Sequence, residues 1–272
     1  MRKTIIIAEP GATHEGDLGK MRALVQMASE CGVDGVKFQW LSDPEALCRR
    51  RNAPEYLPHY MHLRFPARWH ELLAEECDKR GLLYGCTVYL PEDVAVIEPH
   101  VDFFKVAAFE ASARDLIAST VAAMTGDARK LVVSLGLGAL VQDVMVAMDG
   151  LKDIDRLVLL RCISAYPTPF NELHLVTLRS GMNGFSDHTP ADDPHTLLVG
   201  ALATAAGATW IERHVRLEDC RRSNPDYTVS LSAHGLTNYV NGVRFAETVL
   251  GSPNVTGAMP SEKQMLRYRA IT

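Results

Sequence analysis

Short apolar runs alternate with longer segments of mixed polarity along most of the chain. The runs are rich in β-branched and aromatic residues, which is typical of buried strands. The segments between them carry apolar residues at helical spacing, as in 18–31, which Asp17 can cap and Gly32 can end. The predicted strands lie at 4–8, 35–38, 82–87, 103–106, 131–134, 157–161, 184–189 and 210–214, and the later predicted helices lie at 141–152, 172–179, 194–206 and after Ser232.

This alternation predicts a single barrel. Strands that alternate with helices form a parallel sheet, and eight such units in 272 residues predict a closed (β/α)8 TIM barrel of the α/β class. A hydrophobic content of 47% is enough to fill its core. We expect a catalytic barrel domain over residues 1–250 and a C-terminal tail over 251–272, where glycine and proline recur.

The segment 42–65 departs from the pattern. It contains three prolines and the cluster Arg49-Arg50-Arg51, and it is predicted to be the least regular part of the chain. A long loop in a compact domain is usually functional or mobile. The arginines form either a solvated surface, which a charge run alone favours, or a contact with an anion or another subunit.

Polar and titratable side chains gather at the carboxyl ends of the predicted strands. In a TIM barrel this edge is the active-site face. A purely structural protein has no reason to collect acids, bases and hydroxyl groups on one rim, so the pattern indicates an enzyme. The residues are Glu9, Lys37, Gln39, Thr87, Lys105, Glu110, Ser134, Tyr166, Ser186, His188, Glu212 and His214.

His188 and His214 each follow one of two consecutive strands. Parallel neighbours place such strand ends side by side, so the two imidazoles are close enough to share one metal ion, with Glu212 beside them. Two imidazoles suit Mn, Fe, Zn or Co and leave coordination positions open for water and substrate. The alternative is two ordinary histidines at strand ends.

Lys37 and Lys105 lie between apolar strand residues and are expected to point into the barrel. Each is either a Schiff-base nucleophile or a fixed cation for a phosphate or carboxylate. Together with Thr87 and Ser134 they favour a site for a doubly anionic ligand, because buried charges are normally paired. Cys162 ends a strand without an evident base nearby, and we interpret it as a packed core thiol.

The net charge and the cysteine pattern argue against nucleic-acid-binding and disulfide-bonded secreted proteins. A net charge of −5 and a pI near 6.1 argue against general binding of nucleic acids. Six scattered cysteines without a CxxC pair are typical of reduced thiols in a cytoplasmic protein. The first apolar run is too short for a signal peptide, and no run is long enough to span a membrane.

A series of motifs, in order from about residue 4 to 232, resembles the sialic acid synthases. The motifs are Ala8-Glu9-Pro10-Gly11-Ala12-Thr13-His14-Glu15-Gly16, Val36-Lys37-Phe38-Gln39, Lys105-Val106 with Glu110, Val133-Ser134-Leu135-Gly136, Cys162-Ile163-Ser164-Ala165-Tyr166-Pro167-Thr168-Pro169, Ser186-Asp187-His188-Thr189, Glu212-Arg213-His214 and Asn224-Pro225-Asp226. Matches in this order are far more specific than any single motif.

The resemblance implies a reaction and a set of roles. Such enzymes condense phosphoenolpyruvate with an amino-sugar aldehyde, release phosphate and use a divalent metal, here Mn²⁺ or alternatively Mg²⁺ or Co²⁺. By this likeness His188 and His214 bind the metal, and Glu212 or Glu9 handles the attacking water. The other implied roles are phosphate binding by Lys105, Thr87, Ser134 and Ser164, carboxylate binding by Lys37 and Ser186, and sugar binding by Glu9, Gln39, Tyr166 and Asp226, with Glu110 also at the substrate.

The sequence also departs from the family pattern. Ala108-Phe109 replaces Ser-Gly, Thr13 replaces Asn, and Cys86-Thr87-Val88-Tyr89 replaces the usual end of the third strand. Family members continue into a small antifreeze-like domain that covers the partner's site in a homodimer. We expect this chain to form a homodimer and to use the segment 42–65, or a separate lid domain or protein, in place of that cover. The alternatives are a Schiff-base aldolase and a non-catalytic, sugar-binding homologue on the same barrel.

Overall fold

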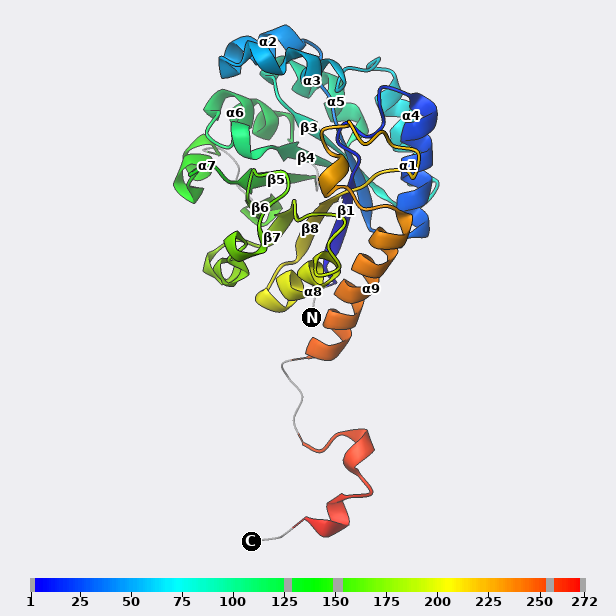
Figure 1. The fold of residues 1–272 in the computed structure, drawn as a ribbon. Coiled ribbons are helices and arrows are strands. Elements are labelled where there is room, and N and C mark those ends of the chain that lie inside the picture. Colours follow the sequence, from blue (N-terminus) through cyan, green and yellow to red (C-terminus); the bar gives the residue numbers. More distant parts are fainter. Residues whose placement is uncertain (1–2, 125–128, 149–153, 253–256, 270–272) are drawn as a thin grey trace.

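Eight parallel strands form a closed barrel in this computed structural model, which describes residues 3–124, 129–148, 154–252 and 257–269 (Figure 1). Each strand pairs with its neighbours in chain order, and β8 closes the barrel on β1. The predicted fold is confirmed. The strands are β1 Ile5–Glu9, β2 Gly35–Gln39, β3 Leu83–Val88, β4 Phe103–Val106, β5 Lys130–Leu135, β6 Leu157–Cys162, β7 Gly184–Asp187 and β8 Trp210–His214.

Helices cover the outside of the barrel (Figure 1). Among them, α8 packs against both β7 and α9. The first begins where the sequence predicts it, because the Asp17 side chain accepts a hydrogen bond from the Lys20 N–H at 2.8 Å. Ser232 also precedes a helix but makes no side-chain cap. The helices are α1 Leu18–Glu30, α4 Trp69–Asp78, α5 Val94–Ile97, α6 Arg114–Ala123, α7 Val141–Ala147, α8 Thr196–Ala206 and α9 Ala233–Leu250.

Two predicted helices differ from the structure. The helix expected at 172–179 is replaced by the 3₁₀ turns η6 (Phe170–Glu172) and η7 (Leu175–Ser180). His174 between them has a φ of 45°, in the left-handed region, which interrupts a right-handed helix. The helix expected over 141–152 ends at Ala147, and residues 149–152 of that prediction lie outside the described residues.

The segment 42–65 is more regular than predicted. It forms α2 (Pro44–Arg51), the turn η1 (Pro54–Tyr56) and α3 (Leu57–Met61), so the expectation of an irregular loop was wrong. Its prolines occupy first-turn positions, where a missing N–H costs nothing, and Asp43 caps α2 through the Ala46 N–H at 2.9 Å. Buried side chains of this segment pack against Ala12 and Tyr89, at the carboxyl ends of β1 and β3.

The interior of the barrel is apolar near the amino ends of the strands and polar near their carboxyl ends. Side chains alternate between the two faces of a strand, so every second residue points inward. Near the amino ends the inward residues form an apolar cluster of Ile7, Phe103, Val132, Val158, Leu160 and Trp210. Gly85 leaves room for the Phe103 ring, since an added Cβ would lie 2.1 Å from its Cζ atom. The next inward residues toward the carboxyl ends are polar.

A buried ion pair lies on the outer side of the last two strands. Arg213 Nη1 contacts Asp187 Oδ1 at 2.8 Å, and both side chains are fully buried. Arg213 also donates to the Thr189 carbonyl oxygen at 2.8 Å, and the Tyr239 hydroxyl of α9 donates to Asp187 Oδ2 at 2.8 Å. This network joins β7, β8 and α9 directly behind His188 and His214.

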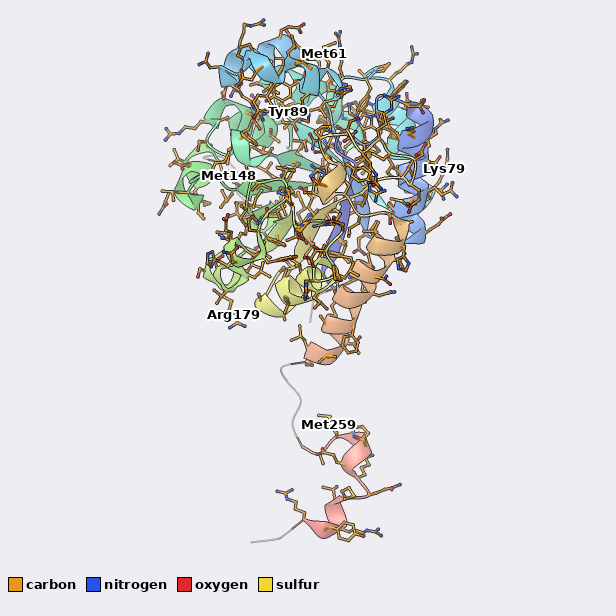
Figure 2. All side chains as sticks on the ribbon, viewed as in Figure 1. Met61, Lys79, Tyr89, Met148, Arg179 and Met259 are labelled. Atoms are coloured by element: carbon orange, nitrogen blue, oxygen red, sulfur yellow. The ribbon has the colours of Figure 1, made fainter. Side chains whose placement is uncertain are left out.

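Residues 257–269 lie apart from the barrel, as the position of Met259 in Figure 2 shows. They form the short turns η9 (Pro260–Glu262) and η10 (Leu266–Tyr268), and their side chains are exposed. The division into a barrel domain over 1–250 and a tail over 251–272 stays a prediction. Among the described helices, none combines the length and the apolar character that a membrane span requires.

The Arg213 network generates a stability prediction. Replacing Arg213 with Met should lower the free energy of unfolding by about 3–5 kcal/mol, because it leaves the Asp187 carboxylate buried without its partner. As a control, Arg80→Met removes the partly exposed partner of Glu76 and should cost about 0–1 kcal/mol. Urea denaturation measures both values, and equal losses would contradict the prediction.

Candidate active site

The centre of the barrel holds one carboxylate between two lysines. Glu212 Oε2 lies 3.6 Å from Lys37 Nζ, and Glu212 Oε1 lies 3.9 Å from Lys105 Nζ. Ser186 donates a hydrogen bond to Glu212 Oε1 at 3.0 Å. All four side chains are buried. Four strands therefore bring together residues that the sequence predicted separately.

Burial and neighbouring charges have opposite effects on the pKa values of Lys37 and Glu212. Burial lowers the pKa of Lys37 to about 8, with Lys105 acting in the same direction and Glu212 opposing it. Burial alone would raise the pKa of Glu212, but Lys105, Lys37 and Ser186 outweigh it and hold that pKa below its usual value. Glu212 is therefore an ionised carboxylate at neutral pH, and it keeps the lysines inside the barrel.

Lys37 has two further partners. It forms an ion pair with Glu9 and donates to Thr87 Oγ1 at 2.7 Å. Thr87 in turn lies opposite Lys105 in the register of β3 and β4. Lys105 donates to the Val106 carbonyl oxygen at 3.1 Å. The structure thus links Glu9, Lys37, Thr87 and Lys105 around one side of the barrel.

The hydroxyl groups of Ser134 and Ser164 lie on the other side. Ser134 Oγ is buried and has no hydrogen-bond partner. Ser164 meets Gly136 and Ala108 where three loops converge, since a Cβ added to Gly136 would lie 3.3 Å from Ser164 Oγ and 3.2 Å from Ala108 Cβ. The unpartnered hydroxyl of Ser134 can donate to a small oxyanion, whereas Ser164 Oγ lies 3.9 Å from Cys162 Sγ.

His188 and His214 lie side by side above Glu212. Their ring centres are 5.3 Å apart, and Tyr166 stacks on His188 at 4.3 Å. His188 Nδ1 donates to the Ile163 carbonyl oxygen at 2.9 Å, and its Nε2 atom faces the Tyr166 hydroxyl at 3.2 Å. Burial lowers the pKa of His188, but Cys162, the Ile163 carbonyl and Glu212 outweigh it and hold that pKa above its usual value. His214 Nδ1 is buried without a partner.

Both imidazoles fit a metal site. A second-sphere carbonyl fixes the tautomer of His188, as in many metal centres. Burial, followed by the charge of His188, holds the pKa of His214 well below its usual value, which keeps this ring neutral. Over the described ranges no third His, Cys, Asp or Glu completes a metal-binding group with them. A bound ion would therefore take its remaining ligands from water and substrate.

Cys162 is buried, as predicted, but the expectation that no base lies nearby was wrong. Its Sγ atom lies 4.0 Å from His188 Nδ1, a contact across 26 residues that the sequence could not show. Burial raises the pKa of Cys162, but His188 outweighs it and the pKa falls below its usual value. Because His188 Nδ1 already donates to Ile163, it is not a free base for the thiol.

A second group of polar residues lines the mouth of the barrel. Glu9 Oε1 accepts from the Gly11 N–H at 2.8 Å and lies 3.4 Å from Gln39 Nε2. Asp226 Oδ2 accepts from the Ala12 N–H at 2.7 Å. Gly11 has a φ of 54°, and a Cβ there would lie 2.3 Å from Asp226 Oδ2 and 3.1 Å from His214 Cε1. A glycine is therefore required where Asp226 meets the histidine.

Glu110 does not join the lysines but pairs with an arginine of the segment 42–65. Arg51 Nε donates to Glu110 Oε1 at 2.7 Å, and Arg51 Nη1 donates to the Tyr60 hydroxyl at 2.7 Å. The neighbouring Arg50 instead pairs with Asp115, and Arg49 is 71% exposed. The interpretation as a solvated surface therefore suits Arg49, whereas Arg51 is part of the site.

Tyr89 is a site residue that the sequence reasoning missed. Its hydroxyl donates to Gln39 Oε1 at 2.6 Å, and its ring lies 5.4 Å from the Arg51 guanidinium carbon. Its place at the end of β3, in a motif that departs from the family pattern, was the available signal.

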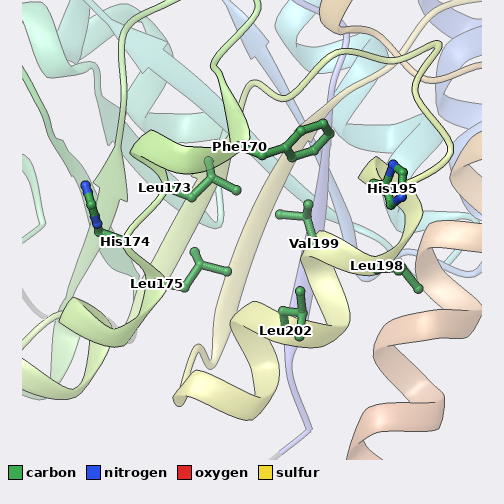
Figure 3. A pocket seen from close by; sticks show the side chains of 8 residues that line it. All are labelled: Phe170, Leu173, His174, Leu175, His195, Leu198, Val199 and Leu202. Carbon is green, nitrogen blue, oxygen red and sulfur yellow. The ribbon is translucent and has the colours of Figure 1, made fainter.

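An apolar groove of about 650 Å³ lies elsewhere, on the outside of the barrel between η6, η7 and α8 (Figure 3). Phe170, Leu173, Leu198 and Leu202 line it. None of the predicted site residues is part of this groove, so it does not change the placement of the site. All fourteen predicted residues lie at the carboxyl-end rim instead, and their individual roles stay predictions.

Comparisons with known proteins identify the family of this chain. The NeuB family matches residues 24–255. The chain is 32% identical to the N,N'-diacetyllegionaminic acid synthase of Legionella pneumophila, over 91% of this chain and 73% of that enzyme. It is 29% identical to the human N-acetylneuraminate-9-phosphate synthase, over 91% of this chain and 71% of that enzyme. Both relatives are named as synthases, which confirms the prediction of a synthase-type enzyme.

A solved structure supports the fold. The N-acetylneuraminic acid synthetase of Leptospira borgpetersenii superposes with a TM-score of 0.82, at 22% identity, over 98% of this chain and 91% of that chain. At this identity the likeness concerns the fold alone. The family match covers most of the chain, however, and the resemblance seen in the sequence motifs is confirmed: this chain belongs to the NeuB family.

Proposed function

We propose that this enzyme condenses phosphoenolpyruvate with an amino-sugar aldehyde to give a nonulosonic acid and phosphate. The observation that carries the proposal is the pair of buried lysines around one ionised Glu212, next to the imidazole groups of His188 and His214. The contacts of Glu212 with Lys37 and Lys105, at 3.6 and 3.9 Å, are longer than hydrogen bonds. Both lysines therefore keep donors for an anionic substrate.

The donor substrate fits the inner part of the site. Phosphoenolpyruvate carries its phosphate group and its carboxylate on the same carbon atom. Lys105 and Thr87 on one side, and the unpaired hydroxyl of Ser134 with Ser164 on the other, would hold the phosphate. Lys37 and Ser186 would hold the carboxylate. Charge-assisted hydrogen bonds of this kind are the strong ones in proteins.

The sugar acceptor would lie at the mouth, against Glu9, Gln39, Tyr166 and Asp226. A divalent ion held by His188 and His214, Mn²⁺ or alternatively Mg²⁺ or Co²⁺, would polarise the aldehyde carbonyl. Tyr166 supports this placement because it stacks on His188 and lies edge-on to His214, with ring centres 5.9 Å apart.

The reaction balances with one water. A carbon–carbon bond forms between the methylene carbon of phosphoenolpyruvate and the aldehyde carbon, whose oxygen takes a proton and becomes a hydroxyl group. Water then adds to the neighbouring cationic carbon, and the carbon–oxygen bond to phosphate breaks. Glu212, ionised and buried beside both lysines, can accept the proton of that water, and Glu9 is the alternative base.

A Schiff-base aldolase is the second candidate. The lowered pKa of Lys37 is the observation in its favour, because a lysine that titrates near neutral pH is a better nucleophile. Borohydride in the presence of a carbonyl substrate would trap a covalent adduct on Lys37 or Lys105 only in this mechanism.

The homodimer, the lid domain or protein and the cytoplasmic location stay predictions.

The histidines generate a prediction on metal dependence. His188→Ala should lower the affinity for Mn²⁺ by about tenfold to a hundredfold or more, and phosphate release should fall with it, because only two side chains hold the ion. Calorimetric titration with Mn²⁺ measures the affinity independently of activity. His195→Ala removes an exposed histidine on the outer groove and serves as the control. Equal affinities of the two variants would contradict the metal site.

Lys105 generates a prediction on donor binding. Lys105→Met should weaken the binding of phosphoenolpyruvate by about tenfold to a hundredfold, since losing a charge-assisted contact costs roughly 1.5–3 kcal/mol. The dissociation constant is measured by calorimetry. Lys79→Met, on the exposed surface of the protein, should leave it unchanged. An unchanged constant in Lys105→Met would count against the assignment.

Lys37 generates a prediction on pH. Because the pKa of Lys37 is lowered to about 8, this side chain is charged below that pH and loses its proton above it. We expect kcat/KM for phosphoenolpyruvate to fall as the pH rises through about 8. Lys37→Arg keeps a charge at every accessible pH and should remove this decline. A wild-type profile that stays flat up to about pH 10 would rule out a role for the Lys37 charge.

A further inference from the structure

The backbone on both sides of His188 is held by one arginine on the outer side of the barrel. Asp187 Oδ1 accepts from the Thr189 N–H at 2.9 Å and from the Thr189 hydroxyl at 2.7 Å, so this carboxylate spans His188. Arg213 donates to the Asp187 and Thr189 carbonyl oxygens at 3.3 and 2.8 Å. Because Arg213 directly precedes His214, a single side chain connects the backbone of the two histidines.

Tyr239 of α9 supports this connection from behind the strands. Its hydroxyl donates to Asp187 Oδ2 at 2.8 Å, and its ring centre lies 5.8 Å from the Arg213 guanidinium carbon. The side chains of Asp187, Arg213 and Tyr239 are all fully buried. A buried carboxylate that loses a donor has no bulk water to replace it, so the bond from Tyr239 fixes the position of Asp187.

A glycine of α8 leaves the space that Tyr239 needs to reach β7. A Cβ added to Gly200 would lie 2.6 Å from Tyr239 Cζ and 2.7 Å from Tyr239 Cε1. A side chain at this position would therefore have to displace the ring and its bond to Asp187. Gly200 lies inside a helix of eleven residues, where glycine is unfavourable by itself, so packing against Tyr239 gives it a reason to be there.

Building on the proposed function, we propose that Tyr239 is a positioning residue for the two imidazoles. It lies behind the strands, and it sets the separation of His188 and His214 through Asp187 and Arg213. Metal–ligand distances are defined to within about 0.2 Å, so a small shift of one histidine against the other weakens their hold on a shared ion. The affinity for a divalent ion therefore depends on a hydroxyl group of an outer helix.

The test compares two buried tyrosines. Tyr239→Phe removes the hydroxyl bond to Asp187 and keeps the ring. Tyr84→Phe is the matched control, because Tyr84 is also fully buried and its hydroxyl is bonded to His70 Nδ1 at 2.8 Å, behind β3 instead of β7 and β8. Calorimetric titration with Mn²⁺ measures the metal affinity independently of activity, and urea denaturation measures the stability.

We expect both variants to unfold at a lower urea concentration, and only Tyr239→Phe to bind Mn²⁺ more weakly. The affinity should fall by at least about threefold, which is less than the roughly tenfold to hundredfold loss typical of partners that bond directly to a metal ligand. An unchanged affinity in Tyr239→Phe, or an equal loss in Tyr84→Phe, would overturn the inference and leave the proposed function intact.

A pair of glycine variants tests the same link from α8. Gly200→Ala displaces the Tyr239 ring and should also weaken Mn²⁺ binding. Gly242→Ala adds a methyl group to the same α8–α9 interface, 3.2 Å from the Leu197 carbonyl oxygen, and should leave the affinity unchanged. Equal losses in the two glycine variants would show a general effect of helix packing and contradict the role of Tyr239.

Crystal structures decide the positioning role without an ion. Wild-type protein that binds no Mn²⁺ would overturn the metal assignment, whereas the separation of the imidazoles can still be measured. The ring centres of His188 and His214 are 5.3 Å apart, and Tyr239→Phe should change this separation or give the rings alternate positions. Rings that stay single and unmoved in Tyr239→Phe would refute the inference.

Discussion

The contact of Glu212 with Lys37 and Lys105 is the interaction on which the site depends. Two lysines inside a barrel carry a large desolvation cost, and a carboxylate between them offsets it. The same contact keeps Glu212 ionised, because each lysine favours its charged form. Glu9 adds a second carboxylate beside Lys37. A closed barrel brings β1, β2, β4 and β8 to one point. The ion pairs among Glu9, Lys37, Lys105 and Glu212 therefore depend on the barrel fold.

Side chains alternate along β8, so this strand takes part in two networks. One is the Glu212–lysine network inside the barrel, and the other is the Arg213–Asp187 pair on its outer side. Glu212 and His214 point into the barrel, and Arg213 between them points outward to Asp187. Asp187 in turn precedes His188, so one buried ion pair holds the backbone behind both imidazoles. The bond from Tyr239 fastens the pair to α9. The histidines are thus positioned by rigid elements and not by a mobile loop, which suits a site that must keep a fixed geometry.

Much of this arrangement could be predicted from the sequence, for reasons that are local. Strand ends such as Phe38-Gln39 and Ile211-Glu212 combine an apolar run with polar residues, and the parallel fold places them on one rim. What could not be predicted depends on contacts between distant residues. The pairing of Arg51 with Glu110 spans 59 residues, and that of Tyr89 with Gln39 spans 50. The helix α2 was missed although Asp43-Pro44 is a regular helix start, because three prolines suggested a loop.

The departures from the family pattern are not spread evenly over the site. Thr13 donates to the Pro10 and Val215 carbonyl oxygens at 2.7 and 2.9 Å, so it stabilises a turn and is not directed at substrate. Ala108 lies beside Gly136, since a Cβ added to that glycine would lie 3.2 Å from Ala108 Cβ. Phe109 and Tyr89 instead both lie against Arg51, at the outer mouth. Ala108, beside Ser164, also lacks the hydroxyl group of the serine that it replaces, so the departures include the phosphate side of the site as well as the mouth. We therefore expect the changes around Arg51 to affect the choice of acceptor, and the change at Ala108 to affect how phosphate is held.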